Sequence, residues 1–348
     1  MRPPRDVYGE EIVKFGVFDH VDDSGASLKD HLNDRLKIIE AYDRCGIHGY
    51  HVAEHHGTPL GYATSPSILL AAAAQRTKRI RIGPLIYILP LYHPLRLIEE
   101  ICLLDNLSDG RFMLGMGRGI SPIEAGFYGV PGSETQARYI EASDLILKAL
   151  QSETLTYQGK YYTFNNVPMT MRPIQKPYPE LWYATRTPES FAWAGKAGIN
   201  TVTLAFDEQV REMTNIYKKA WIDAGRDIKD LPLIGVSRHV VVADTDKEAK
   251  ALASRAYTRW VTSFRKLWLE RGYEAPLKNL YPDTWEELES LLNGCAGSPA
   301  TVRRYALDEA ERCGANYLVS WFAFGDLDVD HVIRSVELFS EHVMPAFV

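Results

Sequence analysis

The residues best suited to chemistry are Glu54, His55 and His56, which directly follow the apolar segment 49–53. Polar side chains at the exit of a buried strand must find hydrogen-bond partners or water. An imidazole in such a place can hold or transfer a proton near pH 7, or hydrogen-bond a reactive oxygen species. The alternative is a structural histidine that is bound to a neighbouring carboxylate, and the pattern of residues leaves both interpretations open.

A second group of residues has the character of an anion site. Segment 185–190, TRTPES, leaves a predicted strand and begins a helix, which provides unpaired backbone N–H groups at the positive end of the helix dipole. Arg118 lies in the glycine-rich stretch 115–119, where small residues let a ligand approach the backbone. This pattern predicts a phosphate site to which Ser190 adds a hydroxyl, while Arg118 and Arg186 add charge. The alternative is an ordinary helix cap beside arginines that pair with surface acids.

Spacing argues against other kinds of site. A metal site, as in a metal hydrolase, would draw on Asp19, His51, His55 and His56. However, His51 and His55 are spaced for a helix, in a segment that we predict to be strand and then loop. The stretch 115–119 does not match GxGxxG, which disfavours a dinucleotide-binding Rossmann site. The four cysteines lie far apart without a CxxC pair, so we expect neither a zinc site nor a disulfide framework.

Eight apolar segments alternate with helical patterns along the chain, and the candidate residues follow them directly. We predict strands at 13–18, 49–53, 80–89, 112–116, 181–184, 200–206, 233–242 and 317–322. This count, without a change of composition that marks a boundary, favours one (β/α)₈ TIM barrel over residues 1–348 rather than a doubly wound sheet. Active-site residues of such barrels sit at the carboxyl ends of the strands, where the two candidate groups would meet.

Two segments interrupt the alternation. Around 155–170 the sequence predicts a hairpin that turns at Gln158-Gly159. Segment 245–293 is the least regular part, and we expect helices and a mobile portion that forms a lid over the barrel mouth. Its scattered aromatic residues are expected to form a small core rather than a platform for nucleic-acid bases.

The composition disfavours several kinds of partner and location. The chain has 348 residues and a formal net charge of -6, so nothing electrostatic favours nucleic acid or an anionic membrane as a partner. No run approaches about 18 apolar residues, and the first residues carry acids where a secretory signal needs an apolar core. We therefore expect a soluble cytoplasmic protein, a location that the widely spaced cysteines also fit.

Longer pieces of the sequence, in order along the chain, resemble the bacterial luciferase-like monooxygenases, a family of flavin-dependent (β/α)₈ enzymes. The pieces are AEHH at 53–56, RIRIG at 79–83, LPLYHPLRLIEE at 89–100, LDNLSDGRF at 104–112, LGMGRG at 114–119, YQGKYYTF at 157–164, AGKAG at 194–198 and GSPATV at 297–302. The resemblance implies a two-component monooxygenase, in which FMN reduced by a separate flavin reductase reacts with O₂ to oxidise a small organic substrate. It also implies a homodimer.

The resemblance further implies roles for individual residues. His55 corresponds to the active-site histidine of the family and would support the reaction of the reduced flavin with oxygen. The residues that would bind the cofactor are Glu54 beside the ring, Leu85 and Ile86 as a non-proline cis peptide under the ring, Arg118, Thr185, Arg186 and Ser190 near the phosphate, and Ile120 and Arg138 elsewhere in the pocket.

The sequence also departs from the luciferases proper. Gly117 stands where they have a reactive-site cysteine, and Ala205-Phe206 where a pocket tryptophan is expected, so we expect neither light emission nor a long-chain aldehyde substrate. Two alternatives stay open: a dehydrogenase or reductase that uses a deazaflavin on the same barrel, and a flavin-binding protein without activity. The presence of His55 argues against the second.

Overall fold

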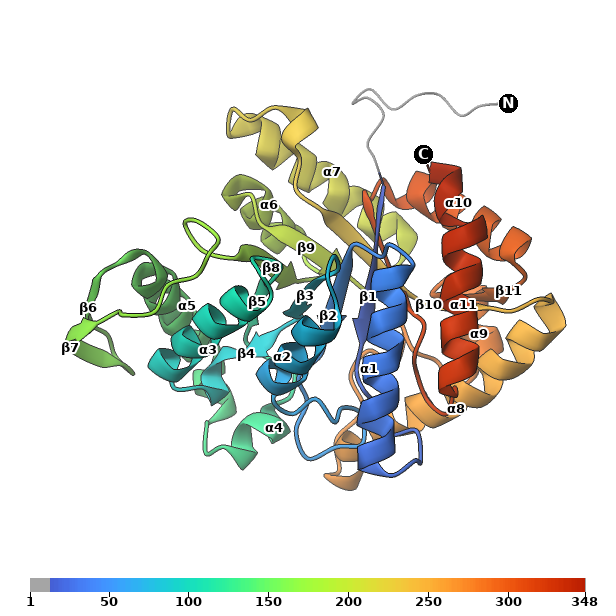
Figure 1. Cartoon of the computed structure of the whole chain (residues 1–348), viewed down its shortest axis with the longest axis horizontal. Coiled ribbons are helices and arrows are strands. Elements are labelled where there is room, and N and C mark those ends of the chain that lie inside the picture. The colour runs from blue at the N-terminus through green and yellow to red at the C-terminus, as the bar shows by residue number, and fades with distance from the viewer. Residues whose placement is uncertain (1–12, 348) are drawn as a thin grey trace.

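Parallel strands form a ring in the structure, a computed structural model that describes residues 13–347 (Figure 1). The ring contains β1 (Lys14–Asp19), β2 (Gly49–Val52), β3 (Arg81–Pro84), β5 (Met113–Gly117), β8 (Glu180–Ala184), β9 (Asn200–Thr203), β10 (Ile234–Val242) and β12 (Tyr317–Trp321). Hydrogen bonds join the strands in the order β3-β2-β1-β12-β10-β9-β8-β5, and a bridge between Ile82 and Phe112 joins β3 to β5. The predicted barrel is confirmed. Segment 1–12, where we expected no secretory signal, lies outside the described residues.

The eight predicted strands are present, with one interruption and one addition. The prediction of an unbroken strand at 80–89 was wrong, because a cis peptide bond between Leu85 and Ile86 divides it. The chain resumes as β4 (Tyr87–Ile88), which pairs with β5. Sequence analysis missed β11 (Gly294–Gly297), which pairs with the second half of β10. Its residues, GCAG, are too few and too small to show an apolar pattern.

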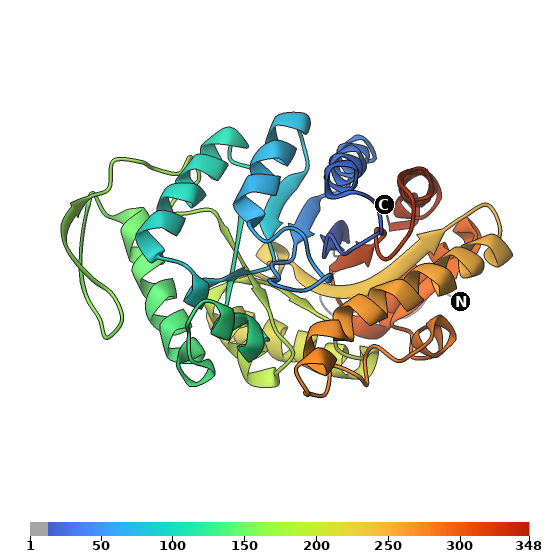
Figure 2. The same cartoon turned by 90° about the horizontal axis from the view of Figure 1, so that it is seen from below.

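Helices surround the strands, and Figure 2 looks from below onto the carboxyl ends of the strands. The longer helices are α1 (Leu28–Arg44), α2 (Pro66–Arg76), α3 (Pro94–Leu107), α5 (Thr135–Gln151), α6 (Pro188–Ala197), α7 (Asp207–Asp223), α8 (Asp246–Glu270), α10 (Pro299–Cys313) and α11 (Val329–His342). Short helical turns are α4 (Pro122–Phe127), α9 (Trp285–Ser290), η1 (Leu89–Leu91), η2 (Gly132–Glu134), η3 (Ile228–Asp230) and η4 (Met344–Phe347). Within residues 13–347, none of the helices is both long and apolar enough to cross a membrane.

The predicted hairpin projects from the barrel as a separate two-stranded sheet, seen in green at the left of Figure 1. It consists of β6 (Thr154–Gln158) and β7 (Thr163–Pro168), which are antiparallel. The carboxylate of Glu141 on α5 accepts hydrogen bonds from the backbone N–H groups of Lys160, Tyr161 and Tyr162 at 2.8–3.0 Å. The turn of the hairpin is therefore held against the helix that precedes it.

Segment 245–293 is more regular than predicted, because it begins with the 25-residue helix α8. The aromatic side chains of α8 that are fully buried face the barrel, where Trp260 packs within 5.4 Å of Trp321, measured between ring centroids. The predicted small aromatic core is thus present. Leu277, in the loop after α8, lines the cavity at the barrel mouth. That this segment forms a mobile lid remains a prediction.

The two strands on either side of the closing bridge approach so closely that they need glycine. A Cβ atom on Gly115 would lie 2.0 Å from the carbonyl oxygen of Pro84, and one on Gly83 would lie 2.2 Å from the carbonyl oxygen of Met113. Real side chains do not tolerate such distances to backbone atoms, and overpacking of this kind typically costs about 1–3 kcal/mol.

We therefore expect Gly115→Ala to lower the free energy of unfolding by about 1–3 kcal/mol. The measurement is the midpoint of urea denaturation. Gly126→Ala is the matched control, since a Cβ on Gly126 meets no atom within 4 Å. Equal midpoints for the two variants would contradict this description of the closing seam.

Candidate active site

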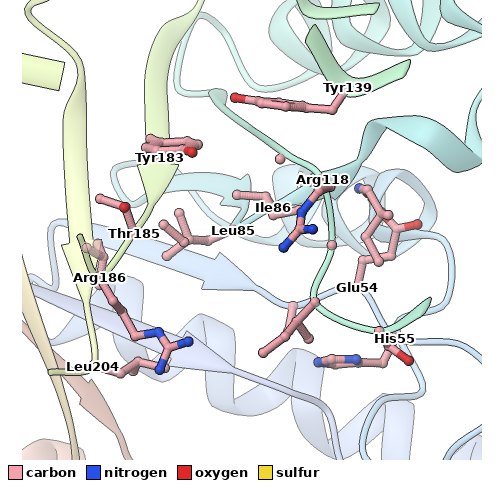
Figure 3. Close-up of a pocket in the computed structure, with 18 of the residues that line it drawn as sticks. Glu54, His55, Leu85, Ile86, Arg118, Tyr139, Tyr183, Thr185, Arg186 and Leu204 are labelled. Carbon is pink, nitrogen blue, oxygen red and sulfur yellow. Dashed lines mark hydrogen bonds between the residues drawn. The ribbon is translucent and has the colours of Figure 1, made fainter. Parts of the chain in front are cut away.

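A cavity of about 560 Å³ opens at the carboxyl ends of the strands (Figure 3). This volume lies within the range of about 300–1,000 Å³ that small-molecule sites occupy. Nine of the ten residues predicted for the site line it, namely Glu54, His55, Leu85, Ile86, Arg118, Ile120, Thr185, Arg186 and Ser190. Glu54 and His55 therefore share one cavity with the Thr185–Ser190 turn. This was predicted from their positions directly after strands.

His55 is held by a buried carboxylate that comes from the loop after β5. Its Nδ1 lies 3.2 Å from Oε1 of Glu124, and the other oxygen of Glu124 accepts the backbone N–H of His56 at 2.9 Å. An ionised carboxylate can only accept, so the proton of a neutral His55 sits on Nδ1. Nε2 makes no hydrogen bond to any residue of 13–347 and is left available toward the cavity, into which the ring points in Figure 3.

His56 is a structural histidine bound to a neighbouring carboxylate, which is the alternative that the sequence left open. Its Nε2 donates to Glu54 at 2.8 Å, and its Nδ1 accepts from the hydroxyl of Tyr128 at 2.8 Å. The second oxygen of Glu54 accepts the backbone N–H of Ile88 at 3.0 Å. Glu54 and His56 are both buried, so this network fixes the ends of β2 and β4 relative to each other. Of the two histidines, His55 is the one free to act on a ligand.

The cis peptide between Leu85 and Ile86, which the family resemblance implied, lies on the cavity wall. A Cβ on Gly117 would lie 2.7 Å from Cδ1 of Ile86, and one on Gly119 would lie 2.7 Å from Cγ2 of Ile88. Gly117 therefore leaves space for the side chain of Ile86, and Gly119 leaves space for that of Ile88. This explains in physical terms why Gly117, rather than a cysteine, fits beside Ile86 in this chain.

The turn that begins α6 has the features of an anion site and of a helix cap at once. Thr187 caps the helix, because its hydroxyl oxygen accepts the N–H of Ser190 at 3.3 Å. The N–H of Thr185 is already bonded to the carbonyl of Val202 at 3.2 Å. Among the described residues, neither the N–H of Arg186 nor the Arg118 guanidinium has a hydrogen-bond partner. An exposed, unpaired arginine at a cavity rim is a ready contact for an anion.

Arg138 is the one predicted site residue that does not line the cavity. Its Nε and Nη2 both donate to Glu134, at 3.0 and 2.8 Å, and its guanidinium lies 4.5 Å from the ring centre of Tyr161. The placement by resemblance therefore does not match the structure. The neighbouring Tyr139 lines the cavity instead, opposite Tyr183 from β8 (Figure 3).

Sequence analysis missed Glu124, the partner of His55. The segment after Gly119 contains α4, whose N-cap Ser121 accepts the N–H of Glu124 at 3.2 Å. A serine followed three residues later by glutamate is a recognised signal for a helix start. That signal could have located α4, but it could not have shown which histidine the carboxylate meets.

The four residues that a metal site would have used, Asp19, His51, His55 and His56, do not gather around one point. Asp19 pairs with Arg35 at 3.2 Å, and His51 bonds the hydroxyl of Tyr317 at 2.9 Å inside the barrel. Neither residue lines the cavity that His55 faces.

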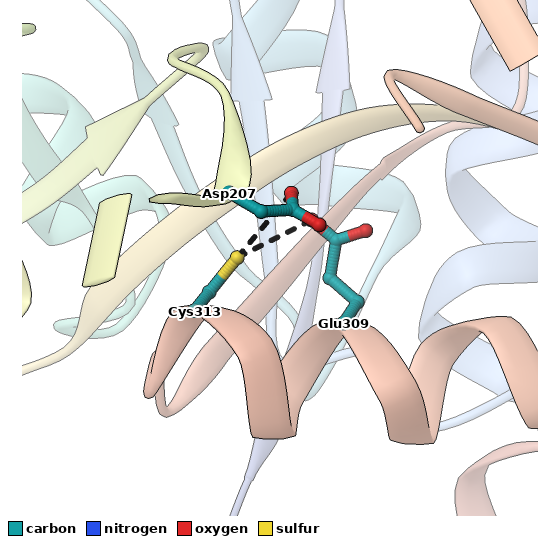
Figure 4. Close-up of side chains that lie close together, drawn as sticks. All are labelled: Asp207, Glu309 and Cys313. Carbon is teal, nitrogen blue, oxygen red and sulfur yellow. Dashed lines mark hydrogen bonds between the residues drawn. The ribbon is translucent and has the colours of Figure 1, made fainter. Parts of the chain in front are cut away.

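A different group of possible metal ligands, Asp207, Glu309 and Cys313, lies within residues 13–347 (Figure 4). Arg238 pairs with both carboxylates, at 2.8 and 2.9 Å, and Arg312 pairs with Asp207 at 2.6 Å. Burial acts to raise the pKa of Asp207, but the two guanidiniums outweigh it and hold that pKa below its ordinary value. Burial raises the pKa of the Cys313 thiol, which keeps it protonated and a poor ligand. The group is a neutralised ion-pair network between α7, β10 and α10.

Because both oxygens of Glu124 are engaged, by Nδ1 of His55 and by the backbone N–H of His56, Glu124 is expected to act through His55 as a positioning residue. If the chain has the flavin-dependent activity that the family resemblance implies, Glu124→Gln should lower kcat by about 10- to 100-fold, less than loss of the imidazole itself, with KM and flavin affinity nearly unchanged. Glu124→Asp, which keeps the charge, should recover part of the loss. Steady-state kinetics of the three proteins make the comparison. A fall in FMN affinity that matches the fall in kcat would instead mean that Glu124 only supports the pocket.

The fold and the site define a (β/α)₈ barrel whose cavity presents an imidazole and an arginine without a partner among residues 13–347. The chain belongs to the luciferase-like monooxygenase family, whose sequence model matches residues 13–312.

Individual relatives agree with this assignment. An uncharacterized protein, y4wF of Sinorhizobium fredii, is 41% identical over 318 residues, which cover 91% of this chain and 92% of the relative. The oxygenase component of the flavin-dependent trigonelline monooxygenase of Acinetobacter baylyi is 25% identical and covers 96% of each chain. The solved oxygenating constituent of 3,6-diketocamphane monooxygenase from Pseudomonas putida, in complex with FMN, superposes with a TM-score of 0.80 at 25% identity, covering 96% of this chain and 98% of the other.

Proposed function

We propose that this protein is the oxygenase component of a two-component monooxygenase, which binds FMN reduced by a separate flavin reductase and uses O₂ to oxidise a small organic substrate. The observation that carries the proposal is the joint presence, in one cavity, of an unpaired arginine and a histidine whose free nitrogen faces inward. The relatives described as a flavin-dependent oxygenase component and as an FMN complex support it.

The residues of the cavity fit FMN. Its phosphate is a dianion, for which Arg118, the hydroxyls of Thr185 and Ser190 and the free N–H groups at the start of α6 are suitable partners. Its ring system is flat and largely apolar, and the side chains of Leu85 and Ile86 offer an apolar wall. The buried Glu54 has both oxygens occupied by protein donors, so it stabilises the wall rather than adding an unpaired charge beneath the ring.

When bound and reduced, FMN supplies the electrons that activate O₂. The chain contributes three things to that chemistry. His55 holds a hydrogen-bonding nitrogen toward the reacting atoms, and Glu124 keeps that imidazole in one tautomer and orientation. The apolar side chains of Phe18 and Leu277 narrow the cavity on the substrate side and exclude water.

Two further parts of the proposal concern the oligomeric state, which rests on the family resemblance, and the cellular location, which rests on the cysteines. We propose a homodimer, which light scattering on the purified protein would test. We also propose a cytoplasmic location, because the four cysteines are all free thiols, as a reducing compartment requires.

The test is an anaerobic titration with reduced FMN and with a reduced deazaflavin, followed by admission of oxygen. We expect reduced FMN to bind at least about tenfold more tightly than the deazaflavin and oxygen to be consumed after mixing. Preferential binding of the deazaflavin would favour a dehydrogenase or reductase on the same barrel. FMN binding without any product from a broad substrate panel would favour a flavin-binding protein without activity.

A further inference from the structure

We infer that the substrate carries an anionic group, such as a carboxylate, and that Arg186 binds this group at the substrate side of the cavity. The inference rests on the proposed function, because it takes Arg118 as the cation of the cofactor phosphate. It changes the role of Arg186, which sequence analysis placed at the phosphate together with Arg118.

The direction of the Arg186 side chain is the first observation. Arg186 follows β8, yet its guanidinium extends away from Tyr183 and Tyr139 and reaches toward Leu204 (Figure 3). Thr185, the preceding residue, turns the other way in the same view. The side chains of Thr185 and Arg186 therefore point in different directions in this view.

The second observation is that nothing in the described part of the chain neutralises this charge. Arg186 makes no hydrogen bond or ion pair with any residue of 13–347. The buried carboxylates on the cavity wall are already committed: Glu54 to His56 and Ile88, and Glu124 to His55 and to the backbone of His56. The Arg186 side chain is exposed, so water solvates its charge in the empty cavity, and a ligand that displaces this water has to supply the partner.

The third observation is the apolar character of the surrounding wall. Leu204 lies beside the guanidinium in Figure 3, and Phe18, Val202 and Leu277 line the same cavity. A guanidinium beside such side chains gains little from its surroundings when a ligand displaces the water, unless the ligand brings a counter-charge. A carboxylate suits it best, because the planar guanidinium can donate two parallel hydrogen bonds to it.

The electrostatics of Tyr281 agree with this placement. Tyr281 is buried in the aromatic core under the loop that carries Leu277. Burial raises the pKa of its hydroxyl, and the positive charges of Arg238 and Arg186 act against that rise. The charge of Arg186 therefore reaches Tyr281, which belongs to the aromatic cluster that Leu277 packs against.

These observations define the substrate class as a small molecule with an apolar body and one anionic group. With the anionic group on Arg186 and the apolar body against Leu204 and Leu277, the remaining part of the molecule faces His55 across the cavity. An uncharged molecule of the same shape would leave the guanidinium unpaired and bind more weakly.

The experiment measures binding of small keto acids and their methyl esters to the protein loaded with oxidised FMN, from changes in the flavin absorbance spectrum. The probes are 4-oxopentanoate, 4-oxocyclohexanecarboxylate and 4-acetylbenzoate, each beside its ester. We expect at least one acid to bind about tenfold or more tightly than its ester, since a charged hydrogen-bonding pair is worth about 1.5–3 kcal/mol. Arg186→Ala should abolish this preference, and Arg186→Lys should keep part of it.

Two control variants separate this inference from the proposed function. Arg118→Ala should weaken FMN and keep the preference for the acid in protein saturated with FMN. Arg334→Ala, which removes an arginine on α11 outside the cavity, should change neither quantity. Arg186→Ala should change FMN affinity by less than about threefold.

The inference is overturned if every ester binds as tightly as its acid, if Arg186→Ala keeps an acid preference, or if Arg186→Ala weakens FMN without weakening riboflavin. The last result would return Arg186 to the phosphate and leave the proposed function intact. Failure of the wild-type protein to bind FMN would defeat the proposed function itself, and the inference with it.

Discussion

His55→Ala should leave FMN affinity within about threefold of the wild-type value while substrate oxidation falls by roughly 10² to 10⁴. The free Nε2 is the only part of this imidazole that faces the ligand, because Nδ1 is bonded to Glu124. The groups that we assign to the phosphate lie on other strands, so binding should survive. The measurement is the ratio of oxidised product to hydrogen peroxide in a reductase-coupled assay, together with the FMN dissociation constant.

The control for this variant is His342→Ala, which removes a half-exposed histidine near the end of α11. It should leave both quantities unchanged. If His55→Ala oxidises substrate as fast as the wild type, His55 has no catalytic role. If it loses FMN in proportion to activity, His55 is part of the binding site instead.

Arg118→Ala should weaken FMN by about 10- to 100-fold and riboflavin by less than about threefold. The two ligands share the ring and the ribityl chain and differ in the phosphate, so the difference isolates the contact with the anion. Arg118 is exposed and has no hydrogen bond or ion pair with residues 13–347, which means that its removal leaves no buried partner unsatisfied. Fluorescence titration of the free flavins gives both constants.

The salt dependence offers a second measure of the same contact. Raising the ionic strength should weaken FMN binding to the wild type more than to Arg118→Ala, because screening acts on the pair that the variant lacks. Equal losses of FMN and riboflavin in Arg118→Ala would argue that Arg118 shapes the cavity and does not contact the phosphate.

The barrel could be predicted because its strands are buried on both faces. β5, for instance, is buried at all five positions, and its residues, MLGMG, include no charged or hydrogen-bonding side chain. The prediction failed where a buried segment has no apolar pattern that reveals it. β11 consists of four small residues, and the division of 80–89 depends on a peptide geometry that leaves no mark in the apolar pattern.

The residues on strand ends could likewise be predicted, since a barrel gathers those ends on one face. Their partners could not. Glu124 is 69 residues from His55 along the chain, and only the folded path of α4 brings the two together. Arg138 was assigned to the pocket by resemblance alone, and its ion pair with Glu134, one helical turn away, takes it elsewhere. The direction of an arginine side chain, as at Arg186, is also set by packing that sequence spacing does not contain.

A crystal structure of the protein with FMN is the most direct test of the central claim. The account predicts density for a flavin in the cavity of Figure 3, with the phosphate bonded to Arg118 and Ser190, the ring against the Leu85–Ile86 peptide and Nε2 of His55 facing the ring. A flavin bound elsewhere, or one whose phosphate lies at the His55 end, would contradict it.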